Sequence, residues 1–165
     1  MRVYDGYVKV DKVEIPLKKG GTAIREIVKS RDAVAVLCKV YGTDKYLLVK
    51  QYRAPVGKYV FEVVAGCVEE GEDPKECAER EIKEETGYEP LSIVSFGEIY
   101  PSPGYSSEKI TLYYSVLDPE RGPQNLDHDE EVEVVELTAE EIFLMRDHGE
   151  LVDAKTQLLV SRILG

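Results

Sequence analysis

The sequence contains few of the residues on which many enzymes depend for catalysis. Only two histidines, His128 and His148, occur in 165 residues, and neither falls in a metal-ligand pattern. This scarcity argues against histidine-based acid–base chemistry and against Ser-His catalysis. The three cysteines, Cys38, Cys67 and Cys77, form an odd number without CxxC spacing, so we expect buried or half-buried free thiols rather than a zinc site.

Basic residues and long apolar segments are also scarce. The chain has 21 lysines and arginines against 32 acidic residues, a net charge of −11. This balance argues against nucleic-acid binding, because phosphate neutralisation needs clustered cations. No apolar run approaches about 18 residues, and the N-terminus MRVYDGYVKV lacks the apolar core of a signal peptide. We therefore expect a cytoplasmic protein that binds neither nucleic acid nor membrane.

The remaining pattern predicts an α/β (α+β) sandwich in which strands dominate. One helix begins with Asp73 as N-cap and ends where Gly87 can take the left-handed conformation. A second has a capping box at Thr138 and Glu141, and a third has Asp153 as its cap. Alternating or continuous apolar runs predict strands at residues 6–16, 23–28, 33–40, 46–53, 58–66, 91–99, 109–117 and 131–137.

Part of the acidic charge between residues 66 and 88 fits an ordinary solvated helix face. Residues three and four apart are neighbours on a helix, so the spacing predicts that Glu76 reaches Arg80 and Glu79 reaches Lys83. Pairs of this kind stabilise an exposed helix modestly. They therefore need no functional explanation.

Three glutamates on the same helix do need one. Glu81, Glu84 and Glu85 sit at i, i+3 and i+4; Arg80 can pair with Glu84, but no cation is placed to neutralise Glu81 against Glu85. Each exposed like-charge pair costs roughly 0.2–0.5 kcal/mol, so stability alone would favour an interleaved cation. Hard carboxylate oxygens gathered in this way suit Mg²⁺ or Mn²⁺. A Glu-rich solvated helix is the alternative at this point.

A further pattern runs through the same stretch. Gly66 is followed after five residues by Glu72 and, after seven more, by REIKEETGY at residues 80–88. This spacing resembles the Nudix box of the Nudix hydrolases, with Tyr88 where an aliphatic residue is commoner. The order of strands and helices also resembles the Nudix fold, a mixed sheet sandwiched between helices. We expect residues 1–30 to form a small antiparallel sheet and residues 31–165 to form the hydrolase domain.

The resemblance implies a role for each matching position. It implies a Mg²⁺ cofactor, with Mn²⁺ also possible, held by the carboxylates of Glu81, Glu84 and Glu85 and by the backbone carbonyl of Ala65. Structural roles are implied for the other positions of the motif, with Glu72 and Arg80 pairing to hold the loop against the helix: Gly66, Glu72, Arg80 and Gly87.

A second stretch, YPSPGYSSE at residues 100–108, is similar to the ADP-ribose pyrophosphatase branch of the family. The likeness implies Mg²⁺-dependent hydrolysis of the pyrophosphate bond of ADP-ribose to AMP and ribose 5-phosphate. Another nucleotide-sugar or dinucleotide, such as GDP-mannose or NADH, is the close alternative, and a non-catalytic nucleotide-binding module is the distant one. Substrate contacts are implied for Arg25, Arg53, Pro103, Gly104 and Glu108.

The general base and the assembly are also expectations of the resemblance. Counting back from the last strand places Glu130 as the base, with Glu131 the runner-up, His128 a distant third and Glu84 a further candidate. Residues 2–28 form a sheet too small to be stable alone. In the resembled branch such a sheet is exchanged between two subunits, which implies a homodimer in which Arg25 enters the partner's site.

The base-stacking residue is less constrained by the sequence. Tyr4, Tyr7 and Tyr52 are possible platforms for the adenine ring, although most of the eleven tyrosines are expected to serve in packing.

Overall fold

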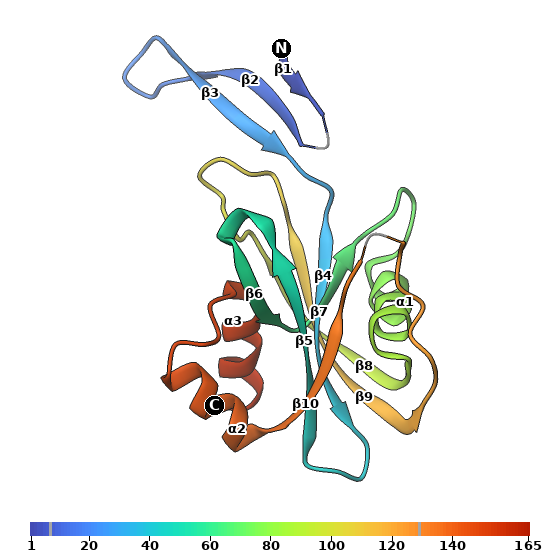
Figure 1. Cartoon of the computed structure of the whole chain (residues 1–165). Helices are drawn as coiled ribbons and strands as arrows, with labels where there is room; N and C mark the ends of the chain where they lie inside the picture. Colours follow the sequence, from blue (N-terminus) through green and yellow to red (C-terminus); the bar gives the residue numbers. More distant parts are fainter. Residues whose placement is uncertain (7, 129) are drawn as a thin grey trace.

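The computed structural model describes residues 1–6, 8–128 and 130–165. The chain begins with a separate antiparallel sheet in the order β1-β2-β3. Figure 1 shows this sheet lying beyond one end of the main body, with β3 leading directly into the first core strand. Its strands are β1 (Arg2–Asp5), β2 (Lys9–Pro16) and β3 (Thr22–Lys29).

The main body is built on a seven-stranded mixed sheet. Its path is β10-β5-β4-β9-β8, while β6 pairs with β5 and β7 pairs with β4. The β4 and β9 strands are parallel, and the other pairs are antiparallel. The strands are β4 (Ala33–Val40), β5 (Lys45–Arg53), β6 (Lys58–Glu62), β7 (Val64–Cys67), β8 (Tyr88–Ile99), β9 (Ile110–Arg121) and β10 (Glu133–Thr138), with a 3₁₀ turn, η1 (Ala54–Val56), between β5 and β6.

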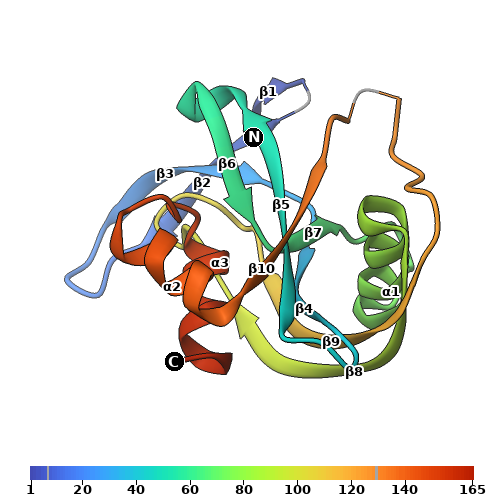
Figure 2. The same ribbon diagram turned by 60° about the horizontal axis from the view of Figure 1, so that its bottom comes forward.

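Three helices cover this sheet from opposite sides. Helix α1 (Pro74–Thr86) lies on one side, and α2 (Ala139–Asp147) and α3 (Ala154–Ile163) lie on the other (Figures 1 and 2). This arrangement confirms the predicted mixed α/β sandwich. In the described part of the chain, no helix is both long and apolar enough to cross a membrane.

The buried strand β4 divides the core into two clusters. Its alternate residues Val34, Val36 and Cys38 pack with Ala78 and Ile82 of α1. The intervening positions of β4 pack with residues from α2 and α3, such as Ile142 and Leu159. A strand with both faces covered needs a continuous apolar run, and this need explains why AVAVLCKV does not alternate.

The helix ends follow the predicted capping chemistry. Asp73 accepts a hydrogen bond from the backbone N–H of Lys75, and Thr138 with Glu141 forms the expected capping box. Gly87 ends α1 with φ = +75°, and a Cβ atom there would overlap the carbonyl oxygen of Gly122. Both the backbone conformation and the close approach therefore require glycine at position 87.

Two expectations, one about the strand at residues 58–66 and one about the burial of the three cysteines, were wrong. The single strand expected at residues 58–66 is divided into β6 and β7 at Val63, whose N–H donates to the Thr156 hydroxyl at 2.8 Å instead of to a neighbouring strand. The second concerns the thiols. Cys38 and Cys77 are buried, but Cys67 is exposed because it ends β7 at the edge of a cavity.

Candidate active site

A cavity of about 810 Å³ opens between the end of β7 with α1 on one side and β5, β6 and the start of α3 on the other. Acidic side chains gather on the wall formed by α1 and the loops before α1, β9 and β10, whereas the opposite wall carries two cations together with two carboxylates. The acidic wall includes Glu69, Glu81, Glu85, Glu108, Asp127 and Glu130 together with Arg80; the wall formed by β5, β6 and α3 includes Arg53, Glu62, Asp153 and Lys155; and Arg31, just before β4, also lines the cavity.

Glu85 is the most unusual group in the acidic wall. Its residue is only 3 % exposed, and its Oε2 atom has no hydrogen-bond partner among the described residues. Burial, together with the charge of Glu81, raises the pKa of the Glu85 carboxyl to about 8. A carboxylate left unpaired in this way is costly unless a positive charge joins it.

Glu81 stands beside Glu85, where the end of β7 approaches the helix. A Cβ atom on Gly66 would overlap the Glu81 carboxylate, so only glycine allows β7 and this side chain to lie so close together. Burial raises the pKa of Glu81, and the negative charges of Glu84 and Glu130 act in the same direction. The backbone at residues 65 and 66 therefore borders the carboxylate cluster directly.

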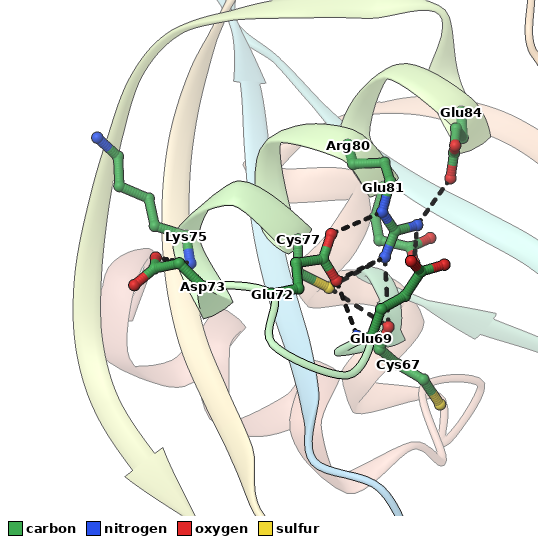
Figure 3. A network of polar contacts seen from close by, with 9 residues as sticks. All are labelled: Cys67, Glu69, Glu72, Asp73, Lys75, Cys77, Arg80, Glu81 and Glu84. Carbon is green, nitrogen blue, oxygen red and sulfur yellow. Dashed lines mark hydrogen bonds and ion pairs between the residues drawn. The ribbon is translucent and has the colours of Figure 1, made fainter.

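Arg80 neutralises more of the acidic wall than the sequence indicated (Figure 3). Its guanidinium donates to Glu72 at 2.8 Å, to Glu81 at 2.7 Å and to Glu84 at 2.9 Å. The hydrogen bonds from Arg80 lower the pKa of Glu72 to about 2. The absence of a cation beside Glu81 was therefore a wrong expectation, because the planar guanidinium serves several carboxylates at once.

The expected outer-face pairs also differ. Lys75, rather than Lys83, contacts Glu79, at 3.7 Å. Lys83 instead contacts Glu89 just beyond the helix, at 2.7 Å. Glu76 has no ion pair with Arg80 in the described structure, because the Glu72 loop occupies the guanidinium.

A divalent cation such as Mg²⁺ needs several oxygen ligands that converge on one point. No group of three His, Cys, Asp or Glu side chains converges in ligand geometry within the described residues. Glu84 points toward Arg80 (Figure 3). It does not line the cavity and instead lines a second hollow on the outer side of α1. Glu81 and Glu85 nevertheless fit a cation, since both are largely buried, both carry raised pKa values and the Oε2 atom of Glu85 is unpartnered.

The opposite wall carries a connected set of four charges. Arg53 donates to both carboxylate oxygens of Glu62, at 2.6 and 2.8 Å. Lys155 donates to Glu62 Oε2 at 2.5 Å and contacts Asp153 at 3.0 Å. Burial by itself would raise the pKa of Glu62, but the contacts with Arg53 and Lys155 outweigh it and hold that pKa below its ordinary value. Of these four, the sequence had indicated only Arg53 as a site residue, and Asp153 only as the cap of the third helix.

The expected substrate contacts are distributed unequally around the cavity. Arg53 and Glu108 line it. Pro103 and Gly104 do not, although Pro101 of the same loop does. Arg25 lies on β3 in the small N-terminal sheet and does not line the cavity of its own chain; its side chain donates to the neighbouring Ile24 carbonyl at 3.0 Å.

The expected stacking platforms also lie apart from one another. Tyr4 is exposed on β1, and Tyr52 forms an edge-to-face pair with Tyr59, with ring centroids 5.6 Å apart, close to the rim. The third candidate, Tyr7, lies outside the described residues.

The loop before β10 brings further carboxylates to the acidic wall. Glu130 lines the cavity, and its backbone N–H donates to the Asp127 carbonyl at 3.0 Å. The negative charge of Glu130 adds to the effect of burial in raising the pKa values of Glu81 and Glu85, which line the same cavity. Among the other described candidates, Glu131 and His128 do not line the cavity.

An acidic helix that faces the partly exposed guanidinium of Arg53 across one cavity suits a cation-dependent hydrolase that acts on a phosphorylated compound. The comparison with family models agrees with this class, since the NUDIX domain matches residues 29–156. The chain therefore belongs to the Nudix hydrolase family, whose members generally use divalent metal ions and act on small nucleotide substrates. This result confirms the predicted family, fold and pyrophosphohydrolase class.

Individual relatives show what the chain is similar to. It is 40 % identical over 159 residues to the ADP-ribose pyrophosphatase of Bacillus subtilis (strain 168), covering 94 % of this chain and 82 % of that protein. It is 38 % identical over 163 residues to the methanol dehydrogenase activator of Bacillus methanolicus, covering 96 % and 86 %. A GDP-mannose pyrophosphatase of Pectobacterium atrosepticum is 27 % identical over 161 residues, covering 92 % and 83 %.

Proposed function

We propose that the protein hydrolyses the pyrophosphate bond of ADP-ribose, giving AMP and ribose 5-phosphate, with Mg²⁺ as its cofactor. The observation that carries the proposal is the pairing of an uncompensated carboxylate, Glu85, with the cationic group Arg53 in one cavity. The first suits a divalent cation and the second suits a phosphate oxygen. The similarity to a named ADP-ribose pyrophosphatase over nearly the whole chain supports this substrate.

Glu81 and Glu85, with Glu84 and the Ala65 carbonyl completing the set, would hold the cation. When bound, it would neutralise the diphosphate and make the attacked phosphorus more electrophilic. Glu84 must leave Arg80 to take part, because its carboxylate is 2.9 Å from that guanidinium. Glu85 already borders the cavity with an unpartnered oxygen, whereas Glu81 borders it while one of its oxygens, Oε1, accepts from the same guanidinium at 2.7 Å.

Glu130 is proposed as the general base. It lies on the cavity wall near Glu81 and Glu85, and the residue is exposed. A carboxylate in this position can accept a proton from the attacking water. Glu84 stays a second candidate for this role, although it faces Arg80.

The proposal includes a homodimer through the N-terminal sheet. This sheet leaves apolar side chains in solvent, and a sheet of three short strands needs a covering surface. Arg25 would then reach the cavity of the partner subunit rather than its own. The apolar residues that this N-terminal segment exposes include Val3, Tyr4, Val8, Val13 and Ile24. Light scattering at micromolar concentration tests the proposed homodimer, and a monomeric mass would contradict it.

The decisive experiment is hydrolysis of a substrate panel with and without Mg²⁺, with both products identified by mass. ADP-ribose, GDP-mannose and NADH should be compared by kcat/KM. We expect AMP and ribose 5-phosphate from ADP-ribose, only when the metal is present. A higher kcat/KM for GDP-mannose would favour the alternative that the GDP-mannose relatives represent.

The cytoplasmic location stays a prediction from the sequence.

A further inference from the structure

The wall of the cavity formed by β5, β6 and the start of α3 is organised around one buried carboxylate. Glu62, at the end of β6, is 2 % exposed and accepts hydrogen bonds from two cations. Arg53 binds it through Nε and Nη2, at 2.6 and 2.8 Å, which is the bidentate fork geometry. Lys155 approaches one of the same oxygens, Oε2, from α3 at 2.5 Å. The carboxylate is therefore held from two directions.

Lys155 owes its position to the way in which α3 begins. Asp153 caps the helix by accepting from the N–H and hydroxyl of Thr156, at 2.9 and 2.7 Å. The Thr156 hydroxyl in turn accepts from the N–H of Val63, the residue that follows Glu62. This contact fixes the first turn of α3 against the junction of β6 and β7. The side chain of Lys155, 12 % exposed, is thereby confined between Asp153 and Glu62.

Arg53 has donors that this network does not use. A guanidinium carries five N–H groups, and Glu62 engages only those on Nε and one on Nη2. The Arg53 side chain is 44 % exposed and lines the cavity, so its remaining donors are accessible to a ligand there. Their direction is set by the carboxylate behind them.

We propose that Lys155 is a positioning residue: by holding the Glu62 carboxylate, it fixes the Arg53 guanidinium in the orientation that binds the substrate. This inference rests on the proposed function, in which Arg53 contacts a phosphate oxygen of the substrate. Lys155 itself donates to two protein carboxylates, so it acts through Arg53. Without Lys155, Glu62 stays paired with Arg53 but is held from one side only.

The test is a double-mutant cycle with ADP-ribose and Mg²⁺. We expect Lys155→Met to raise KM about 10-fold with kcat changed less than about 2-fold, because a contact equal in ground and transition states is weakened. Arg53→Ala should raise KM at least as much. In the Arg53→Ala background, Lys155→Met should then have no further effect on KM. Independent, multiplicative effects of the two substitutions would overturn the proposal.

Two further variants separate positioning from general stabilisation. Lys155→Arg keeps the charge and the donors and should restore most of the lost affinity. Lys45→Met is the matched control, since Lys45 makes a single ion pair with Glu141 at 3.5 Å and does not line the cavity. It should leave KM unchanged. An equal rise in KM for Lys45→Met would contradict a specific role for Lys155.

The double-mutant cycle can be interpreted even if Lys155→Met folds poorly. Circular dichroism establishes folding first, and Lys155→Gln, which keeps a polar donor, replaces Lys155→Met in the cycle if that variant is unfolded. A failure of the proposed function looks different, because the wild-type enzyme would then not hydrolyse ADP-ribose. An active wild type with additive variants rejects only the role of Lys155.

Discussion

The two walls of the cavity handle buried charge in opposite ways. In the wall formed by β5, β6 and α3, the carboxylates of Glu62 and Asp153 are matched by Arg53 and Lys155. In the wall formed by α1, Arg80 is shared among several carboxylates and the Oε2 atom of Glu85 has no partner in the described structure. The first wall is electrostatically complete in the protein alone. The second becomes complete only with an added cation.

The largest expected effect concerns the wall formed by α1, whose charges are balanced only with an added cation. Glu85→Gln should lower kcat/KM for ADP-ribose about 10³-fold, the upper range for losing one preorganised electrostatic group. The metal-free variant should nevertheless fold normally, because an amide is easier to bury than an unpaired carboxylate. Steady-state kinetics measures the change, with Glu79→Gln on the outer face of α1 as the control. Full activity of Glu85→Gln would overturn its assignment.

The second prediction concerns the pH dependence of stability without metal. The folded-state pKa of Glu85 is raised to about 8 by burial and by the charges of Glu81, Glu130 and Glu62. A raised carboxyl pKa means that the contribution of Glu85 to stability is fully present below its ordinary pKa and is lost as pH rises toward 8. The free energy of unfolding of Glu85→Gln, relative to that of the wild type, should therefore rise by roughly 3 kcal/mol between pH 5 and pH 8.

Urea unfolding at both pH values, with the metal chelated, measures this gain. Adding Mg²⁺ at pH 8 should stabilise the wild type more than the variant. A constant difference between the two proteins across this range would show that Glu85 is already compensated.

The smallest expected effect concerns the complete wall. Thr156→Val keeps the shape of the side chain but removes the acceptor for the buried N–H of Val63. We expect a loss of about 1–3 kcal/mol in the free energy of unfolding, because a buried donor is left unsatisfied. Urea denaturation measures it, and Thr43→Val, in an exposed turn, is the control. A loss equal to that of the control would mean that the Val63 contact is unimportant.

Local signals account for what the sequence predicted well. The caps at Asp73 and Thr138, the left-handed glycine at position 87 and the apolar run at residues 33–38 of β4 each depend on residues within one element. Side chains on one helix are likewise placed by its period, which brought Glu81 and Glu85 together. These features needed no knowledge of distant contacts.

Distant contacts account for what the sequence did not predict. Glu62 and Lys155 are 93 positions apart, and neither belongs to a motif that names the other as its partner. The choice of Arg80 between Glu76 and Glu72 depended on how the preceding loop folds back. The break at Val63 depended on the Thr156 hydroxyl, which accepts from the Val63 N–H and belongs to a helix near the end of the chain. Each of these contacts exists only after the sheet has brought separate segments together.

The junction between the two sheets has a practical consequence for anyone who divides this chain. The N–H of Val28, on β3, donates to the Tyr105 carbonyl at 2.8 Å, and the Ser107 N–H donates back to the Val28 carbonyl at 3.0 Å. The loop so attached also carries Pro101 and Glu108, which line the cavity. A truncation at residue 31 would therefore remove both of these hydrogen bonds to the cavity rim along with the small sheet. The first thirty residues support this rim, and a fragment without them would not report faithfully on the enzyme.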